Sequence, residues 1–190
     1  MITRKIILAS KSPRRKQLLE EAGFQFEVKT REVDESYPAS IPTEKVAEYL
    51  AEKKAKGIQD LITDDEIILT SDTIVVLGNT IFGKPKDAED AFNILKQLSG
   101  KTHQVITGVC LLSKNKKKIF SSSSKVHFDI LSDSEIHYYV NKFKPFDKAG
   151  AYAIQEWIGL CKIKKIEGTY SNIMGLPMRE VYFELINFDK

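Results

Sequence analysis

The chain has 190 residues, of which 42% are hydrophobic and 29% are charged, and its formal net charge is +3. This composition excludes disordered and collagen-like proteins, and no apolar run approaches the ~20 residues of a membrane-spanning helix. The net charge alone is too small to argue for a nucleic-acid partner, although it suits an anionic small ligand. The apolar segment at the N-terminus is too short for a signal peptide, so we expect a cytoplasmic protein with no membrane partner.

No repeat or linker divides the chain, so we expect one domain over residues 1–190, long enough for two lobes that share a sheet. Cys110 and Cys161 lie far apart in apolar segments, without CxxC spacing. This arrangement favours two buried, reduced thiols over a disulfide or a metal site.

The first predicted unit is a strand that runs directly into a helix. An apolar run ends at Leu8, Ser12 is placed as the N-cap, and a proline follows at the first helical position. Arg14 and Arg15 then occupy the first turn, where the helix dipole disfavours cations. Together with the Ser10 and Ser12 hydroxyls they predict a phosphate receptor, while the alternative is that both arginines extend into water.

The segment over residues 24–57 contributes acidic residues and one unusual lysine. A short alternating strand precedes an acidic loop over residues 30–42, which carries Glu35, and a helix is predicted over residues 43–57. At 100° per residue, Lys54 falls within the apolar stripe of that helix. A lysine there either extends its ammonium to solvent or meets a partner, such as a phosphate.

A buried strand over residues 66–71 is predicted to end at Asp72, and the strand resumes from Thr73. Ligands bind at the carboxyl ends of strands in open α/β sheets, which makes Asp72 a candidate site residue. The alternative for Asp72 is that it braces a turn. A hairpin turn at Gly78 follows, and Lys84 is held between a glycine and a proline, a rigid way to present one amine.

The remainder alternates helices and strands. The expected elements are a helix from about residue 87 to 98, strands over 103–112 and 118–130, a capped helix from 132, a strand over 160–166, a loop over 168–176 and a final helix from 177. The basic run SKNKKK is placed at a solvated hairpin tip. Small residues surround Gln155, which allows a ligand to approach the backbone closely.

These residue types indicate a reaction class. Carboxylates that can hold a hard divalent cation, combined with cations that neutralise phosphate oxygens, are what metal-assisted phosphoanhydride hydrolysis requires. The residue types name no substrate.

Five ordered blocks carry a resemblance along the whole chain: LASKSPRRKQLL, SDTIVVLGNTIFGKP, LSGKTHQVITGV, DKAGAYAIQ and IEGTYSNIMGLP. They resemble the Maf family of nucleoside triphosphate pyrophosphatases. The resemblance implies an α/β fold similar to that of the inosine triphosphate pyrophosphatases, with a mixed, twisted sheet and flanking helices in two lobes around a cleft. It also implies cleavage between the α and β phosphates, a divalent cation (Mg2+ or Mn2+) and a homodimer.

By motif, the resemblance assigns catalytic roles to Asp72, Glu35, Lys84 and Lys54, with Asp72 as the general base. Our own hypothesis is that Glu35 and Asp72 hold the divalent cation. It makes Arg14, Thr73 and Gln155 the positions that separate substrate subclasses. The motifs around Arg14 and Gln155 are similar to those of the subclass that hydrolyses dTTP and UTP. The chain departs from the family pattern at Ser71, Ala153 and Glu156-Trp157, and the last change lies beside the predicted base contact.

Plainer interpretations accompany these roles. Glu35 is also explained as an exposed loop carboxylate, and Gln155 as an amide that braces its own loop. For the whole protein, the alternatives are a nucleotide-binding regulator of septum formation or cell division with little turnover and, with less support, a nucleic-acid-binding protein.

Overall fold

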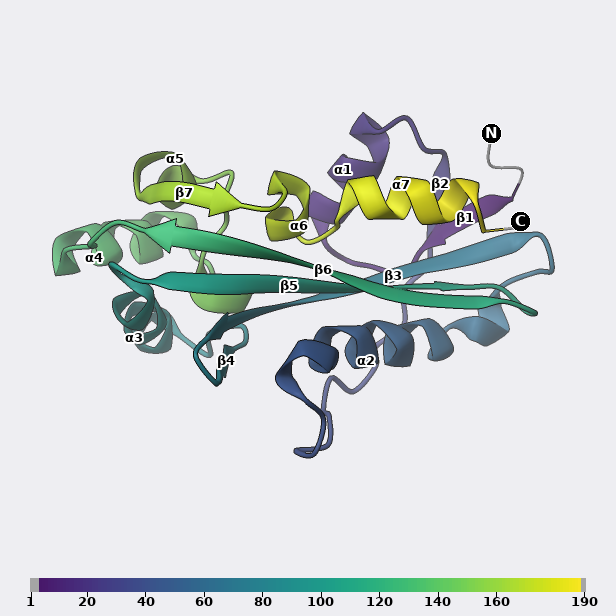
Figure 1. The fold of residues 1–190 in the computed structure, drawn as a ribbon, viewed down its shortest axis with the longest axis horizontal. Helices are drawn as coiled ribbons and strands as arrows, with labels where there is room; N and C mark the ends of the chain where they lie inside the picture. Colours follow the sequence, from purple (N-terminus) through teal and green to yellow (C-terminus); the bar gives the residue numbers. More distant parts are fainter. Residues whose placement is uncertain (1–3, 189–190) are drawn as a thin grey trace. The chain divides into compact units, whose positions relative to one another are not determined.

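The computed structural model describes residues 4–188 (Figure 1). The strands are β1 (Lys5–Leu8), β2 (Phe26–Val28), β3 (Glu66–Leu77), β4 (Thr80–Phe82), β5 (Thr102–Leu112), β6 (Lys117–Phe128) and β7 (Ile163–Glu167). The α-helices are α1 (Pro13–Glu21), α2 (Thr43–Lys56), α3 (Ala88–Leu98), α4 (Asp133–Phe143), α5 (Trp157–Cys161), α6 (Tyr170–Met174) and α7 (Met178–Ile186). Two 3-10 turns cover Gln59–Leu61 and Ala149–Ala151.

The chain divides into two compact units. Unit 1 comprises Met1–Asp72, Thr107–Ser122 and Gly175–Lys190, and unit 2 comprises Thr73–Ile106 and Ser123–Met174. The long strands β3, β5 and β6 each contribute residues to both units.

The strands form a mixed sheet in the order β2-β1-β3-β5-β6-β7, with β4 paired to β3. β1 pairs in parallel with both β2 and β3, whereas β4 is antiparallel to β3 and β7 is antiparallel to β6. The predicted mixed α/β class with flanking helices is therefore confirmed.

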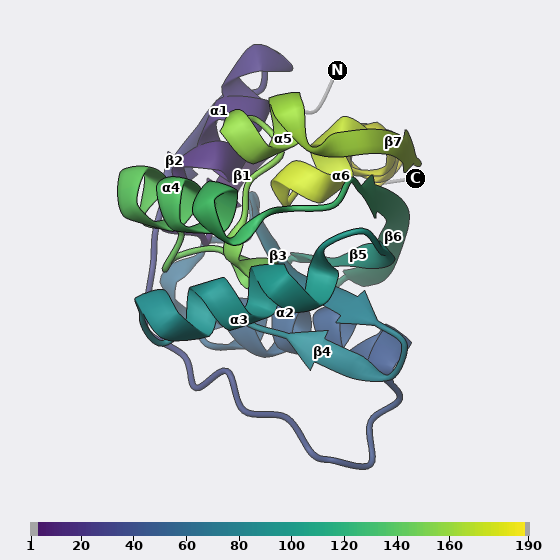
Figure 2. The ribbon, with the colours of Figure 1, turned by 90° about the vertical axis from the view of Figure 1, so that its left-hand side faces the viewer.

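The core of unit 1 forms where α2 packs on the sheet. Its buried members come from α2, the turn that follows it, and three strands: Ile7, Ala51, Ala55, Ile58, Ile62, Ile68, Cys110 and Leu112. A Cβ atom at Gly108 of β5 would lie 2.3 Å from the backbone carbon of Ala47, so only glycine allows this close approach of α2. α1 and α7 lie on the opposite side of β3 from α2 (Figures 1 and 2).

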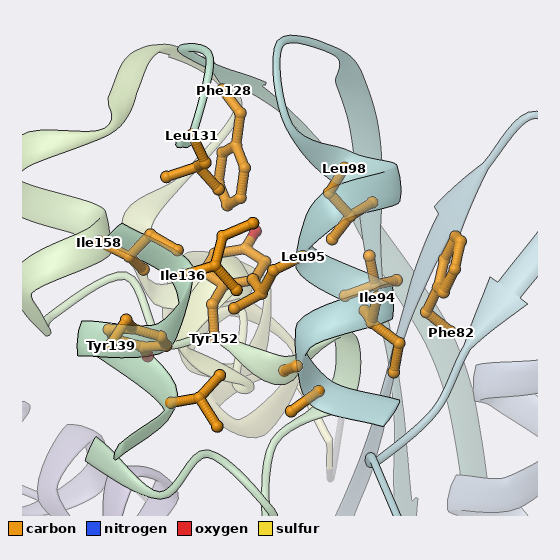
Figure 3. Packing of buried hydrophobic residues seen from close by; sticks show 14 of the residues in the cluster. Phe82, Ile94, Leu95, Leu98, Phe128, Leu131, Ile136, Tyr139, Tyr152 and Ile158 are labelled. Carbon is orange, nitrogen blue, oxygen red and sulfur yellow. The ribbon is translucent and has the colours of Figure 1, made fainter. Parts of the chain in front are cut away.

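Unit 2 has its own core, in which aromatic and aliphatic side chains of α3 and α4 meet those of the neighbouring strands (Figure 3). Tyr139 and Ile136 of α4 are fully buried opposite Leu95 and Leu98 of α3. The Phe92 and His137 rings stack 4.6 Å apart between the same two helices, which lie side by side in Figure 2. The predicted capping box at Ser132, which starts α4, is confirmed.

Four local predictions are wrong. Asp72 does not end a strand, because β3 runs without a break from Glu66 to Leu77. The predicted strand from Leu160 starts too early, because Leu160 and Cys161 are the last residues of helix α5 and β7 begins at Ile163. The loop predicted over residues 168–176 contains helix α6. Cys110 is buried as expected, and burial raises the pKa of its thiol to about 12, but Cys161 is exposed. Short helices of five residues carry too little periodicity to be recognised from sequence.

Within residues 4–188, no helix combines the length and the apolar character needed to cross a membrane. The N-terminal segment used for the signal-peptide prediction lies partly outside these residues.

Candidate functional site

The start of α1 follows the predicted local geometry, but not its predicted capping. Ser12 occupies the N-cap position and proline the first helical position, yet the Ser12 side chain makes no capping hydrogen bond. Instead the Ser12 amide donates to the Ser10 hydroxyl over 3.2 Å. The first turn contains no acidic residue and carries Arg14 and Arg15, as the sequence indicated.

Arg15 points into unit 1. Its Nε donates to the carbonyl oxygen of Gly175 at 2.9 Å, and its Nη1 donates to the carbonyl oxygen of Ser71 at 2.8 Å and to the Ser10 hydroxyl at 3.3 Å. For Arg15, the alternative interpretation that its side chain extends into water is therefore wrong. The guanidinium braces the start of α1 against β3 and against the segment before α7.

Burial lowers the pKa of the Arg15 guanidinium, and the nearby Asp72 carboxylate opposes that shift. An arginine remains charged after such a change because its ordinary pKa is above 12. Ser71, which also donates its hydroxyl to the Gly175 carbonyl at 3.1 Å, completes the contact. The sequence indicates the glycine-bounded segment around Gly175 but not the role of its carbonyl oxygen.

Lys54 contacts two carboxylates within unit 1. Its side chain is 16% exposed, and its ammonium lies 2.5 Å from Asp72 Oδ1 and 2.8 Å from Glu35 Oε1. The inward direction predicted from the helical angle is confirmed, and the partners are two carboxylates. We call Arg15, Glu35, Lys54 and Asp72 the ionic cluster.

The acidic loop is tied to α2 by two adjacent lysines. Glu35 contacts Lys54, while Asp34 accepts from Lys53 at 2.8 Å and from the hydroxyl and amide of Ser36. These hydrogen bonds hold the pKa of Asp34 well below its usual range. Lys53 was not singled out from the sequence, because at 100° per residue it falls at the edge of the apolar stripe and not within it.

The ionic cluster offers two carboxylates to a divalent cation. No group of three or more histidine, cysteine or acidic side chains suited to a metal occurs in the described part of the chain. Two carboxylates nevertheless fit Mg2+, which is commonly bound through one or two carboxylates, with waters and substrate phosphates as the other ligands. Glu35 and Asp72 are the residues with that chemistry.

Thr73, Lys84 and Gln155 belong to unit 2, whereas the ionic cluster belongs to unit 1. Thr73 follows Asp72 directly in β3 and is partly buried. Lys84 is exposed beside the buried Pro85, and the carbonyl oxygen of Gly83 accepts a hydrogen bond from the Gly150 amide at 3.1 Å. The structure thus anchors the segment that presents Lys84.

Gln155 is partly buried, and its Oε1 atom is buried without a hydrogen-bond partner among residues 4–188. A buried acceptor without a donor is rare in folded proteins and calls for a specific explanation. The alternative interpretation, an amide whose hydrogen bonds are satisfied within its own loop, does not hold for this oxygen.

The basic hairpin tip is largely neutralised within unit 1. Lys114 pairs with Asp64, Lys117 with Glu52 and Lys118 with Glu184, at 2.6, 2.6 and 3.3 Å. Lys116 lies over the Phe188 ring. These internal pairs weaken the interpretation of the run as a nucleic-acid-binding patch.

Comparison with known proteins identifies the family. The family model described as Maf-like protein matches residues 5–188. A "dTTP/UTP pyrophosphatase" of Bacteroides thetaiotaomicron is 49% identical over 95% of this chain and 94% of that protein. Proteins with the same name from Phocaeicola vulgatus (50% identical, 95% and 94% covered) and Flavobacterium psychrophilum (47% identical, 96% and 94% covered) also match.

Among solved structures, the Ham1 protein of Staphylococcus aureus matches with a TM-score of 0.47 and 12% identity, over 66% of this chain and 72% of that one. This likeness is too weak to carry an argument. Because the family model spans almost the entire chain and relatives at 47–50% identity cover it from end to end, the chain belongs to the Maf family.

Proposed function

We propose that this protein is a nucleoside triphosphate pyrophosphatase that hydrolyses dTTP and UTP to the monophosphate and pyrophosphate. The observation that carries the proposal is the convergence of Glu35 and Asp72 on the Lys54 ammonium, at 2.8 and 2.5 Å, within a family whose similar members are named for this activity. Carboxylates and cations held together in this way suit hydrolysis of a phosphoanhydride.

Asp72 acts as the general base. In the reaction a water oxygen attacks the α-phosphorus, the bond to the bridging oxygen of the β-phosphate breaks, and pyrophosphate leaves. Asp72, through a carboxylate oxygen, takes the proton of that water. Asp72 lies within the continuous strand β3, and its side chain is only 11% exposed and contacts Lys54.

Glu35 and Asp72 would hold Mg2+ or Mn2+. When bound, such an ion stabilises charge on the phosphate oxygens and lowers the pKa of a coordinated water. The two carboxylates balance its charge, and the loop that carries Glu35 is anchored to α2 through Lys53 and Lys54.

The cations neutralise charge that develops on the departing pyrophosphate. We assign this role to Lys54 and Lys84. We assign the binding of phosphate oxygens to Arg14 and to the hydroxyls of Ser10 and Ser12. Arg15 contributes its positive charge while its hydrogen bonds to Ser71 and Gly175 hold α1 in place.

Thr73 and Gln155 contact the nucleoside. The Gln155 amide offers a donor and an acceptor, which match the N3–H and carbonyl groups of uracil and thymine. A base that left these groups unpaired would be strongly disfavoured. We further propose a cytoplasmic homodimer that acts on free nucleotides rather than on nucleic acid.

The proposal is tested with purified protein, Mg2+ and a panel of dTTP, UTP, CTP, dATP, dGTP and 7-methyl-GTP. We expect dTTP and UTP to react fastest, with equal amounts of pyrophosphate and monophosphate. In 18O-water the label should enter the monophosphate, because the attack is at the α-phosphorus. Release of single phosphate, or label in pyrophosphate, would contradict the assigned reaction.

The same panel separates the alternatives. Nucleotide binding without any product would favour a regulator, and a preference for 7-methyl-GTP would place the protein in another subclass. A Gln155→Glu variant that kept the substrate ranking would show that Gln155 does not contact the base.

A further inference from the structure

The segment that carries Gln155 is a closed turn in unit 2. The Glu156 amide donates to the carbonyl oxygen of Ala153 over 3.2 Å, which places Gln155 between the two ends of the turn. We call residues 153–156 the Gln155 turn. The orientation of Gln155 therefore depends on the contacts that Ala153 and Glu156 make with the rest of unit 2.

One hydroxyl holds both ends. Tyr139 of α4 is fully buried, and its hydroxyl oxygen accepts from the Ala153 amide at 3.0 Å. The same hydroxyl donates to Glu156 Oε2 in a short hydrogen bond. Burial first, and the Glu156 carboxylate second, raise the pKa of Tyr139, so the hydroxyl keeps its proton at neutral pH.

The other oxygen of Glu156 is held as well. Lys148, which is 8% exposed, places its ammonium 3.4 Å from Glu156 Oε1 and 2.7 Å from Asp147. Below the turn, a Cβ atom at Gly159 would lie 1.7 Å from the carbonyl oxygen of Ile154, so α5 packs directly on the turn backbone. The Gln155 turn is thus constrained at both ends by Tyr139 and Lys148, and along its backbone by α5.

Within this rigid turn, Gln155 Oε1 is buried without a donor from the described residues. A buried acceptor that receives no hydrogen bond destabilises the folded protein, and a ligand N–H group that donated to this oxygen would remove that free-energy penalty. Uracil and thymine carry such a group at N3, whereas cytosine has no hydrogen there.

We infer that Tyr139 and Glu156 are positioning residues for substrate selection: they fix the Gln155 turn so that Gln155 Oε1 meets the N3–H of a uracil or thymine base. The inference rests on the proposed function, and it assigns selectivity to two residues that do not touch the nucleotide. We call the contacts of the Tyr139 hydroxyl with Ala153 and Glu156 the clamp.

Tyr139→Phe tests the clamp because it removes only the hydroxyl. Tyr138→Phe is the matched control: this neighbouring tyrosine is 44% exposed, and its hydroxyl accepts from Lys142 rather than from the turn. For Tyr139→Phe we expect the ratio of kcat/KM for UTP to that for CTP to fall about tenfold, the effect of losing roughly one hydrogen bond, mainly through a higher KM for UTP. Tyr138→Phe should keep the ratio of the parent.

Two further variants keep the test decisive if Tyr139→Phe does not fold. Glu156→Ala should lower the same ratio, while Glu156→Gln, which still accepts from Tyr139, should restore part of it. A purely structural role would change the melting temperature without changing the ratio. Unchanged UTP:CTP selectivity in folded Tyr139→Phe or Glu156→Ala would overturn the inference.

A second measurement separates this inference from the proposed function. Trp157, the only tryptophan of the chain, follows Glu156 directly, so its fluorescence reports on the turn. Titration with UMP should change the emission, and the Kd for UMP should rise about tenfold in Tyr139→Phe. If the parent binds UMP in this way but hydrolyses no triphosphate, the proposed reaction fails while the clamp stands. An unchanged Kd in Tyr139→Phe would refute the clamp whatever the activity.

Discussion

The ionic cluster of unit 1 and the Gln155 turn of unit 2 are held by different forces. In the cluster, Lys54 and Arg15 are charged groups that lie next to the charged groups of Glu35 and Asp72, so each one depends on its neighbours for charge balance. In the turn, hydrogen bonds of the Tyr139 hydroxyl, a backbone hydrogen bond and a glycine contact determine most of the geometry, and the only charged contact is that of Glu156 with Lys148 among the contacts described above. We expect changes of charge to act mainly on the first region and changes of shape or hydrogen bonding on the second.

The largest expected effect is that of changing Asp72, the proposed general base in the ionic cluster. Asp72→Asn keeps the shape and removes the charge, so kcat for dTTP should fall by about 10³-fold, within the range for losing a general base. Pyrophosphate release measures it. Asp60→Asn is the control, since Asp60 is an exposed carboxylate paired with Arg31, and it should retain the parental rate. A parental rate in Asp72→Asn would show that charge in the cluster does not drive the chemistry.

Shape also matters in unit 1, where α2 carries Lys54 over β5. Gly108→Ala would place a Cβ 2.3 Å from backbone atoms of Ala47 and Glu48, which cannot yield as a flexible side chain can. We expect the free energy of unfolding to fall by about 3 kcal/mol, measured by urea denaturation.

The matched control is Gly83→Ala, because nothing lies within 4 Å of the added Cβ there. Its free energy of unfolding should change by less than about 1 kcal/mol. Equal losses in the two variants would mean that the close approach of α2 is not a constraint.

The interior of unit 2 contains a titratable group to which the proposed mechanism assigns no role. His103 is 1% exposed, its Nε2 lies 2.8 Å from the Tyr152 hydroxyl, and burial lowers its pKa from 6.5 to about 4. The unfolded chain therefore binds a proton at a higher pH than the folded one. The neutral His103 side chain therefore contributes stability that is fully present above about pH 6.5 and is lost as the pH falls towards 4. The free energy of unfolding should decrease by about 3 kcal/mol in total through this group.

Urea denaturation at pH 7 and pH 4.5 measures that loss. Because carboxylates also titrate in this range, the informative quantity is the difference between the parent and His103→Gln, which has no imidazole to protonate. The variant should lose less stability than the parent on acidification. Equal losses would show that His103 is not kept neutral by the core of unit 2.

The smallest expected effect concerns the two carboxylates of the ionic cluster. The Lys54 ammonium contacts oxygens of both Glu35 and Asp72, so it competes with a divalent cation for the same atoms. In Lys54→Met we expect the Kd for Mn2+ without nucleotide to fall about tenfold, or roughly 1.4 kcal/mol, as measured by electron paramagnetic resonance of free Mn2+.

Lys53→Met is matched for charge and lies on the same helix, but Lys53 pairs with Asp34. Its Kd for Mn2+ should stay near that of the parent. If both variants tightened Mn2+ binding equally, the effect would come from net charge and not from the position of Lys54.

Local sequence patterns predicted much of this structure. The helical angle of Lys54, the proline at the start of α1, the capping box of α4 and the hairpin at Gly78 are set by neighbours a few residues away, and each is confirmed. The ordered motifs also identified the family before any geometry was considered.

Long-range contacts lay beyond such patterns. Nothing near Arg15 in the chain indicates that its guanidinium contacts the carbonyl of Gly175, which lies 160 positions away. Three other features also depend on how distant segments pack and not on local pattern. They are the unbroken passage of β3 through Asp72, the exposure of Cys161, and the shared contact of Tyr139 with Ala153 and Glu156.

By itself the sequence determined which chemical groups are available, the secondary structure of the long periodic segments, and membership of the Maf family. Only the tertiary structure decided which of those groups meet: that Lys54 lies between two carboxylates, and that one buried hydroxyl holds both ends of the Gln155 turn. The physical reason is that periodicity and capping depend on adjacent residues, whereas hydrogen bonds and ion pairs depend on distances that packing sets only after distant segments have come together.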